Sequence, residues 1–170
     1  MQLTPEQTHE LKELLVNCLN KLYTADISLI QRRGLERSIT FRFGLYLYEA
    51  VKNVEWINAI NLSLRNENQL NELIKIDVEY TKNGLDPKRT PRRLRGAYPD
   101  IIIHRREHND LNIFVIEIKG WWDDRPRIDD RNKLEDFTDQ EGDYRYGLGV
   151  LLELNADNYE ISEYFQPYEW

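Results

Sequence analysis

The first third of the chain has the apolar spacing of two helices. From residue 11 to 22, apolar residues recur at helical intervals. They follow a capping box and a helix-starting proline, formed by Thr4, Pro5 and Gln7. We therefore expect a helix over 5–23 and a second helix over 35–51, joined by a connection that ends at Gly34. The pattern over 52–72 is ambiguous, with a short helical signal at its end.

The middle and the end of the chain show strand patterns interrupted by one more helix pattern. IKIDVEY, 74–80, alternates apolar and polar residues, which predicts a half-buried strand. DIIIHRR and NIFVIEIKG are nearly continuous apolar runs, typical of strands covered on both faces. The short EHNDL between them predicts an antiparallel hairpin. A helix is expected over 128–140, with Asp129 or Asp130 as its N-cap. The last two strand patterns are a buried one at 146–154 and an edge one at 159–165.

These elements predict the fold class and the organisation of the chain. The class is α/β, with a mixed central β-sheet flanked by α-helices in the order α-α-β-β-β-α-β-β. A chain of 170 residues suits one domain with its own core, expected over 1–170. Cys18 is the only cysteine, which excludes an internal disulfide and a Cys-rich zinc site. No secretory signal pattern or membrane-length apolar window is present, so we expect a cytoplasmic protein with no membrane partner.

A basic loop over 82–99 contrasts with the formal net charge of −7. It holds three prolines, two glycines and six lysines or arginines, and it shows no periodicity. The acidic whole argues against a protein that coats polyanions in general, but binding responds to the local field. The loop is either solvated or a clamp for a phosphate backbone. The clamp residues would be Lys88, Arg89, Arg92, Arg93 and Arg95.

Three charged residues stand at the ends of the two hairpin strands. Asp100 precedes the first apolar run, and Glu117 and Lys119 lie near the end of the second. Glu117 and Lys119 are two positions apart, so their side chains point to one face of the strand. An antiparallel hairpin brings Asp100 alongside, which gathers two carboxylates and an ammonium at one sheet edge. Carboxylates suit Mg²⁺ or Mn²⁺, and a lysine beside them can act on an attacking water.

Pro99-Asp100 followed by Glu117-Ile118-Lys119 resembles the PD-(D/E)xK motif of the restriction-endonuclease-like nuclease superfamily. The order of elements over about 35–155 is similar as well. The resemblance implies a restriction-endonuclease-like core in which Asp100 and Glu117 bind the metal and Lys119 assists the water. It implies that Glu36, near the start of the second helix, joins the metal site. The alternative for Glu36 is a first-turn carboxylate that the helix dipole favours.

Three further residues are candidates for lining the site. Lys133 matches a position on the helix after the motif where some members place a polar residue. Glu79 either lines the cleft or, like Asp77, belongs to a solvated sheet face. Trp122 follows the motif directly, where it could narrow the site or stack on bases; at least one of Trp121 and Trp122 is expected in the core.

The sequence therefore predicts a Mg²⁺- or Mn²⁺-dependent nuclease that acts on DNA, with RNA as the other nucleic-acid substrate. The alternative is a catalytically silent module of the same fold, which binds nucleic acid or a protein partner, for example in a defence or toxin system. A homodimer and a regulatory protein partner are compatible with either function.

Overall fold

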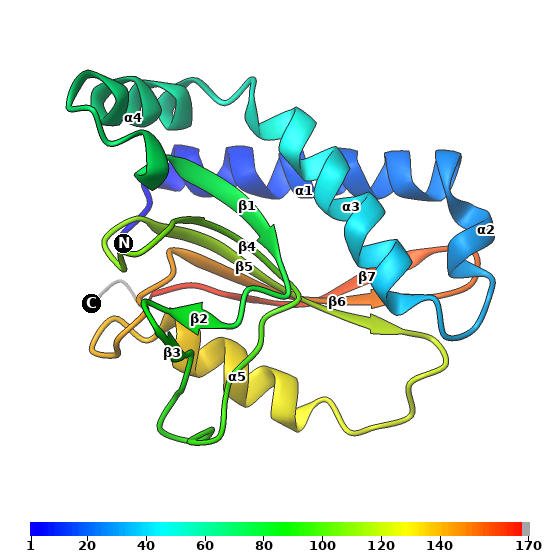
Figure 1. Cartoon of the computed structure of the whole chain (residues 1–170). Helices are drawn as coiled ribbons and strands as arrows, with labels where there is room; N and C mark the ends of the chain where they lie inside the picture. Colours follow the sequence, from blue (N-terminus) through cyan, green and yellow to red (C-terminus); the bar gives the residue numbers. More distant parts are fainter. Residues whose placement is uncertain (168–170) are drawn as a thin grey trace.

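The computed structural model describes residues 1–167 and has a five-stranded mixed sheet between two layers of helices (Figure 1). The strand order is β1-β4-β5-β6-β7. Strands β5 and β6 are parallel, and the other neighbours are antiparallel. The strands are β1 (Ile74–Val78), β4 (Ile101–Arg105), β5 (Asn112–Gly120), β6 (Leu148–Leu154) and β7 (Tyr159–Phe165). The predicted hairpin is thus confirmed as β4–β5, and β7 is an edge strand as expected.

Helices cover both faces of this sheet (Figure 1). Helices α1 and α3 lie across one face, and α5 lies across the other. The helices are α1 (Pro5–Ala25), α2 (Ile27–Ile30), α3 (Glu36–Val51), α4 (Glu55–Asn66) and α5 (Ile128–Thr138), with a 3₁₀ turn η1 (Leu70–Glu72). None of these helices has the length and apolarity needed to cross a membrane within the described residues.

Strand β5 forms the centre of the core because all nine of its residues are buried. Its alternate side chains enter two separate apolar clusters. Phe114, Ile116 and Ile118 face the cluster that includes α1 and α3. Val115 faces the cluster on the α5 side, which includes Leu134. A strand covered on both faces has no solvated side, which explains its continuous apolar run.

The structure corrects several details of the expected elements. The segment of ambiguous pattern contains α4, in which Ile57 and Leu64 are buried and Trp56 and Ile60 pack against the core. Helix α5 has no side-chain N-cap: Arg127 is at the cap position, and the predicted cap role of Asp129 or Asp130 is wrong. The long loop includes a two-stranded ribbon, β2 (Lys82–Asn83) and β3 (Asp86–Pro87).

The alternating pattern predicted that Asp77 of β1 lies on a solvated face of the sheet. The structure shows instead that Asp77 is partly buried. Its Oδ2 is 3.0 Å from Nε2 of His104, a buried residue of β4, and 2.8 Å from Nε of Arg106. The sheet edge at β1 therefore carries a part-buried ion-pair network rather than a row of free polar groups.

Lys88 is buried in the structure, with 2% of its surface exposed. Its ammonium lies 4.8 Å from the ring centre of Tyr144 and 5.5 Å from that of Tyr80. Burial lowers the pKa of Lys88 from 10.5 to about 8, and the charge of Asp77 opposes this shift only in part. The two tyrosine rings stabilise the ammonium from the side, but they do not replace the water that it has lost.

We predict that Lys88 makes the stability of the fold depend on pH in the alkaline range. Between pH 8 and 10.5 the folded chain binds fewer protons at Lys88 than the unfolded chain, so the free energy of unfolding rises with pH over this window. Relative to Lys88→Met, the wild type should gain up to roughly 3 kcal/mol from pH 8 to 10.5, measured by urea unfolding. Lys82→Met, which changes an exposed lysine of the same loop, is the control. Parallel pH curves for wild type and Lys88→Met would contradict the prediction.

Candidate functional site

The β4–β5 hairpin sets Asp100 beside Glu117. Ile101 pairs with Ile116 in the antiparallel register, so the next positions outward, 100 and 117, face each other. Asp100 is fixed there because its Oδ2 accepts a hydrogen bond of 2.7 Å from the backbone N–H of Ile118. The alternation along β5 points Glu117 toward the α5 side of the sheet, opposite to its apolar neighbours.

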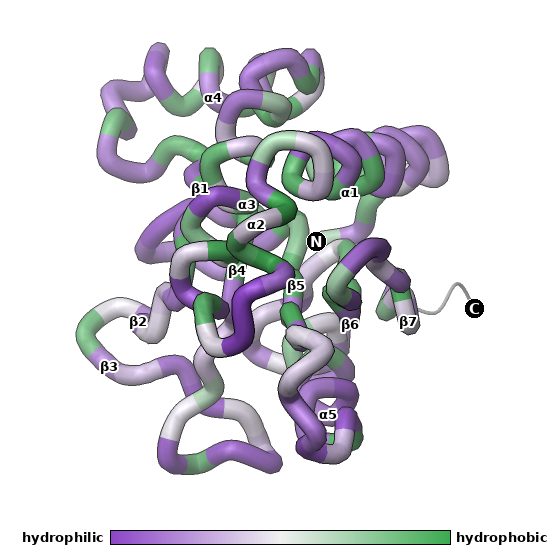
Figure 2. Tube along the Cα trace, turned by 90° about the vertical axis from the view of Figure 1, so that its right-hand side faces the viewer, coloured by the Kyte–Doolittle hydropathy of each residue, from purple (hydrophilic) through white to green (hydrophobic). Residues whose placement is uncertain are grey.

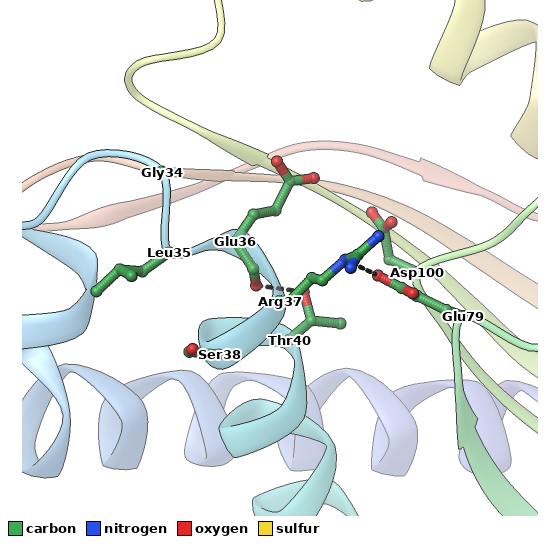
Figure 3. Close-up of a pocket in the computed structure, with 8 residues that line it drawn as sticks. All are labelled: Gly34, Leu35, Glu36, Arg37, Ser38, Thr40, Glu79 and Asp100. Carbon is green, nitrogen blue, oxygen red and sulfur yellow. Dashed lines mark hydrogen bonds and ion pairs between the residues drawn. The ribbon is translucent and has the colours of Figure 1, made fainter.

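A pocket of about 430 Å³ opens in front of Asp100. The start of α3 forms one wall, and Figure 3 shows Arg37 extending from it toward the carboxylates of Glu79 and Asp100, while the Glu36 side chain points upward in this view. Nε of Arg37 is 3.4 Å from Oε1 of Glu79, and both side chains are exposed. The structure thus brings Glu36, Glu79 and Asp100 to one pocket, although they come from three different elements. The remaining lining residues are Gly34, Leu35, Ser38 and Thr40.

Glu117 lies deeper than this pocket, with 1% of its surface exposed. Lys133 reaches it from α5, with Nζ 2.5 Å from Oε2 of Glu117. The same ammonium donates a hydrogen bond of 3.0 Å to the carbonyl of Tyr98. The other carboxylate oxygen of Glu117, Oε1, is buried and has no hydrogen-bond partner among the described residues. One half of this carboxylate is therefore neutralised, and the other half is left without a cation or a donor.

The electrostatics show that the two carboxylates are short of positive charge. Burial raises the pKa of Asp100 to about 6, although the N–H of Ile118 and the ammonium of Lys133 act in the opposite direction. Burial, followed by the charge of Asp100, raises the pKa of Glu117 well above its usual range. A cation placed near both carboxyl groups would lower their pKa values, because it favours their ionised forms.

Lys119 is held away from Glu117 by two aspartates that the sequence analysis did not select. Its Nζ is 3.2 Å from Oδ2 of Asp130 on α5 and 3.4 Å from Oδ2 of Asp123. Burial works against the charge on Lys119, but these two carboxylates raise its pKa. Asp130 also lies near Lys133, three positions further along α5, with its Oδ1 4.0 Å from Nζ of that lysine.

The carboxylates suit a hard divalent cation. Within residues 1–167, no three or more acidic, histidine or cysteine side chains are gathered in a position to hold a metal ion. Mg²⁺, however, commonly takes only one or two carboxylates and completes its shell with water and substrate oxygens. Asp100 and Glu117 meet that requirement, and the unpartnered Oε1 of Glu117 leaves one buried oxygen free for an ion. The residues therefore fit Mg²⁺ or Mn²⁺.

Two of the predicted site residues do not reach the site. Lys88 is buried under tyrosine rings, so it cannot contact a phosphate backbone, and its predicted role in the clamp is wrong. Trp122 packs against the core on the α1 side, and its ring lies over Gly120, so it does not line the pocket. The expectation that at least one of the two tryptophans joins the core is therefore met. Trp121 is 43% exposed and donates a hydrogen bond to the carbonyl of Ile30.

The other basic residues of the loop divide into two groups. Arg92 lies against α5, with NH1 2.6 Å from Oε2 of Glu135 and Nε 3.5 Å from Oδ1 of Asp136. Arg93 lies 3.8 Å from a carboxylate oxygen of Asp129. The acidic side of α5 thus neutralises Arg92 and Arg93, while Lys82, Arg89 and Arg95 are exposed.

Comparison with known proteins does not add a family to these observations. No family model, no curated protein and no solved structure matches the chain. Any function must therefore be argued from the side chains themselves.

We predict that the ion pair between Lys133 and Glu117 is strongly coupled. Lys133→Met should lower the free energy of unfolding by about 3–5 kcal/mol, because it leaves the Glu117 carboxylate buried without a counter-ion. In a Glu117→Gln background the same change should cost at least about 1 kcal/mol less, as a double-mutant cycle in urea would measure. Additivity of the two single changes to within about 0.5 kcal/mol would show that the pair is not coupled.

Proposed function

We propose that this chain is a metal-dependent nuclease of the restriction-endonuclease-like class, which hydrolyses phosphodiester bonds of DNA. The observation that carries the proposal is the β4–β5 register, which sets Asp100 beside Glu117 at the edge of a pocket. The order of elements adds support: Glu36 begins α3, a strand and the hairpin follow, and the next helix brings Lys133 to Glu117.

Asp100 and Glu117 would hold the ion, and Glu36 lies on the wall of the same pocket. When bound, Mg²⁺ or Mn²⁺ supplies Lewis-acid stabilisation of the charge that develops on phosphorus and its oxygens. The backbone N–H of Ile118 keeps the Asp100 carboxylate in a fixed orientation, so little reorganisation is needed on binding.

Lys119 and Lys133 would supply fixed positive charge on the buried side of the site. Asp123 and Asp130 keep Lys119 protonated and restrict its motion. A protonated lysine can donate hydrogen bonds to a water or to a phosphate oxygen, but it cannot bind a metal ion. Its contribution is therefore to orient the attacking water and to offset negative charge in the transition state.

A catalytically silent module that binds nucleic acid is the second candidate. One observation favours it: the ammonium of Lys133 contacts Glu117 directly, and Lys119 is engaged by two aspartates. Such a network neutralises part of the site without a metal ion. The two candidates differ in metal binding and in cleavage, and each can be measured.

We predict that Mn²⁺ binds at Asp100 and Glu117. Calorimetric titration should give a heat of binding for the wild type that is lost in Asp100→Asn and in Glu117→Gln. The metal should also raise the melting temperature of the wild type, because it binds the folded state. Glu49→Gln, which changes an exposed carboxylate at the far end of α3, is the matched control and should bind as the wild type does. Equal heats for wild type and Asp100→Asn would contradict the metal site.

We predict that Lys119→Met separates metal binding from catalysis. The variant keeps the aliphatic stem, and Asp123 and Asp130 keep a second cation each, Arg125 and Lys133, so the fold and the Mn²⁺ titration should be retained. Cleavage should fall by about a hundredfold or more, because the donor aimed at the water and the developing charge is lost. The assay uses supercoiled and linear DNA, single- and double-stranded, and RNA, each with Mg²⁺ or Mn²⁺.

Lys82→Met serves as the control for a lysine outside the site. If the wild type and Lys119→Met cut equally fast, Lys119 has no catalytic role. If the wild type binds Mn²⁺ but cuts none of these substrates, the silent module is the better description.

A further inference from the structure

The connection between α2 and α3 carries positive charge that no acidic side chain of the described residues neutralises. Arg32 and Arg33 are both exposed, and neither forms an ion pair with any residue in 1–167. Figure 2 shows this connection on the side that faces the viewer, at the front of the molecule. On a chain with a formal net charge of −7, two adjacent unneutralised arginines create a local positive field.

This connection leads directly into the pocket that Asp100 lines. Gly34 and Leu35, the next two residues, are part of the pocket wall. Gly34 has a φ of 84°, in the left-handed region that favours glycine, and this turn directs the chain into α3. The two arginines therefore directly precede the pocket wall along the chain, with no long loop between them and the pocket.

Arg37 extends the positive surface by one turn of α3. Its side chain is 89% exposed, and its partner Glu79 is 51% exposed. An ion pair so open to solvent contributes little to stability, so the guanidinium is available to a stronger anionic partner. Figure 3 shows Arg37 lying across the mouth of the pocket toward Glu79 and Asp100.

The chain holds a second Arg-Arg pair that provides the contrast. Arg92 and Arg93 are paired with carboxylates of α5. A phosphate would have to displace those carboxylates, whereas Arg32 and Arg33 exchange only water and counterions. Of the two pairs, the one between α2 and α3 has the charge free for binding and the position beside the site.

We propose that Arg32, Arg33 and Arg37 bind the phosphodiester backbone of a nucleic-acid strand and lead it to the Asp100 pocket. This surface rests on the proposed nuclease function for its substrate class. It replaces the loop over 82–99 as the main phosphate contact. The arginines act by charge and bidentate hydrogen bonding to phosphate oxygens, so they bind without preference for base sequence.

The test compares the two arginine pairs in the same chain. Binding of fluorescein-labelled single- and double-stranded DNA is followed by fluorescence anisotropy, in EDTA to prevent cleavage, across a series of KCl concentrations. Arg32→Ala/Arg33→Ala should weaken binding at least tenfold at low salt. It should also reduce the slope of log affinity against log salt by about 2, because two phosphate contacts are lost. Arg92→Ala/Arg93→Ala, the matched control, should stay within twofold of the wild type.

A charge-preserving variant separates lost contacts from altered folding. Arg32→Lys/Arg33→Lys should keep most of the salt slope, since lysine also neutralises phosphate. The melting temperatures of the Arg32/Arg33 variants should match that of the wild type, because these two side chains are exposed. An unchanged slope for Arg32→Ala/Arg33→Ala, or an equal loss in the Arg92/Arg93 control, would overturn the proposal. So would the absence of any DNA binding by the wild type.

The outcomes also separate this surface from the nuclease itself. If the wild type cuts DNA and the Arg32/Arg33 variant binds and cuts it equally well, the proposed phosphate-binding surface is contradicted and the proposed nuclease function is supported. If DNA binding depends on Arg32 and Arg33 but no substrate is cut, the proposed phosphate-binding surface is supported and the proposed nuclease function is contradicted.

Discussion

The burial of Glu117 inside the central strand is the constraint on which the rest of the site depends. A carboxylate in the middle of a sheet that is covered on both faces loses its water, and an isolated charge there would be strongly unfavourable. Lys133 of α5 provides the compensating positive charge, because its ammonium contacts the Glu117 carboxylate. That contact helps to fix which face of α5 meets the sheet, and it thereby places Asp130 against Lys119. One buried carboxylate thus organises a layer of alternating charges between β5 and α5, in the middle of an otherwise apolar interface.

The parts of the site that depend on local geometry could be predicted from the sequence. Side chains alternate along a strand, and a short polar connection specifies an antiparallel hairpin, so the proximity of Asp100 and Glu117 follows from about twenty consecutive residues. The partners of Lys119 could not be found in this way. Asp130 lies in the first turn of α5, where the sequence predicted a helix cap. Its side chain contacts Lys119 instead, because α5 packs on the sheet. The expected cap role failed because a tertiary ion pair replaced a local hydrogen bond.

The basic loop shows a second limit of sequence reasoning. Composition counts charges but does not count the partners that neutralise them. Arg32-Arg33 and Arg92-Arg93 are the same dipeptide, yet the second pair meets three carboxylates of α5 and the first meets none among the described residues. Lys88 belongs to the same basic run and is buried, because Tyr80 and Tyr144 come from separate segments to cover it. The fold decides how many of the basic residues in a segment remain without an acidic partner. The number of lysines and arginines in the segment is therefore only an upper limit on its local positive charge.

Lys133 meets the electrostatic need of the buried carboxylates only in part. Lys133 contributes one positive charge to one oxygen of Glu117 and leaves the other oxygen unpartnered. It therefore supports the fold without fully neutralising the carboxylates, whose pKa values stay raised. A site neutralised completely by its own lysines would have no remaining affinity for a divalent ion, and a site without Lys133 would leave a buried charge unpaired in the metal-free fold. The partial neutralisation seen here allows the chain to fold without an ion and leaves one buried carboxylate oxygen unpartnered, which is the condition that the proposed metal site would require.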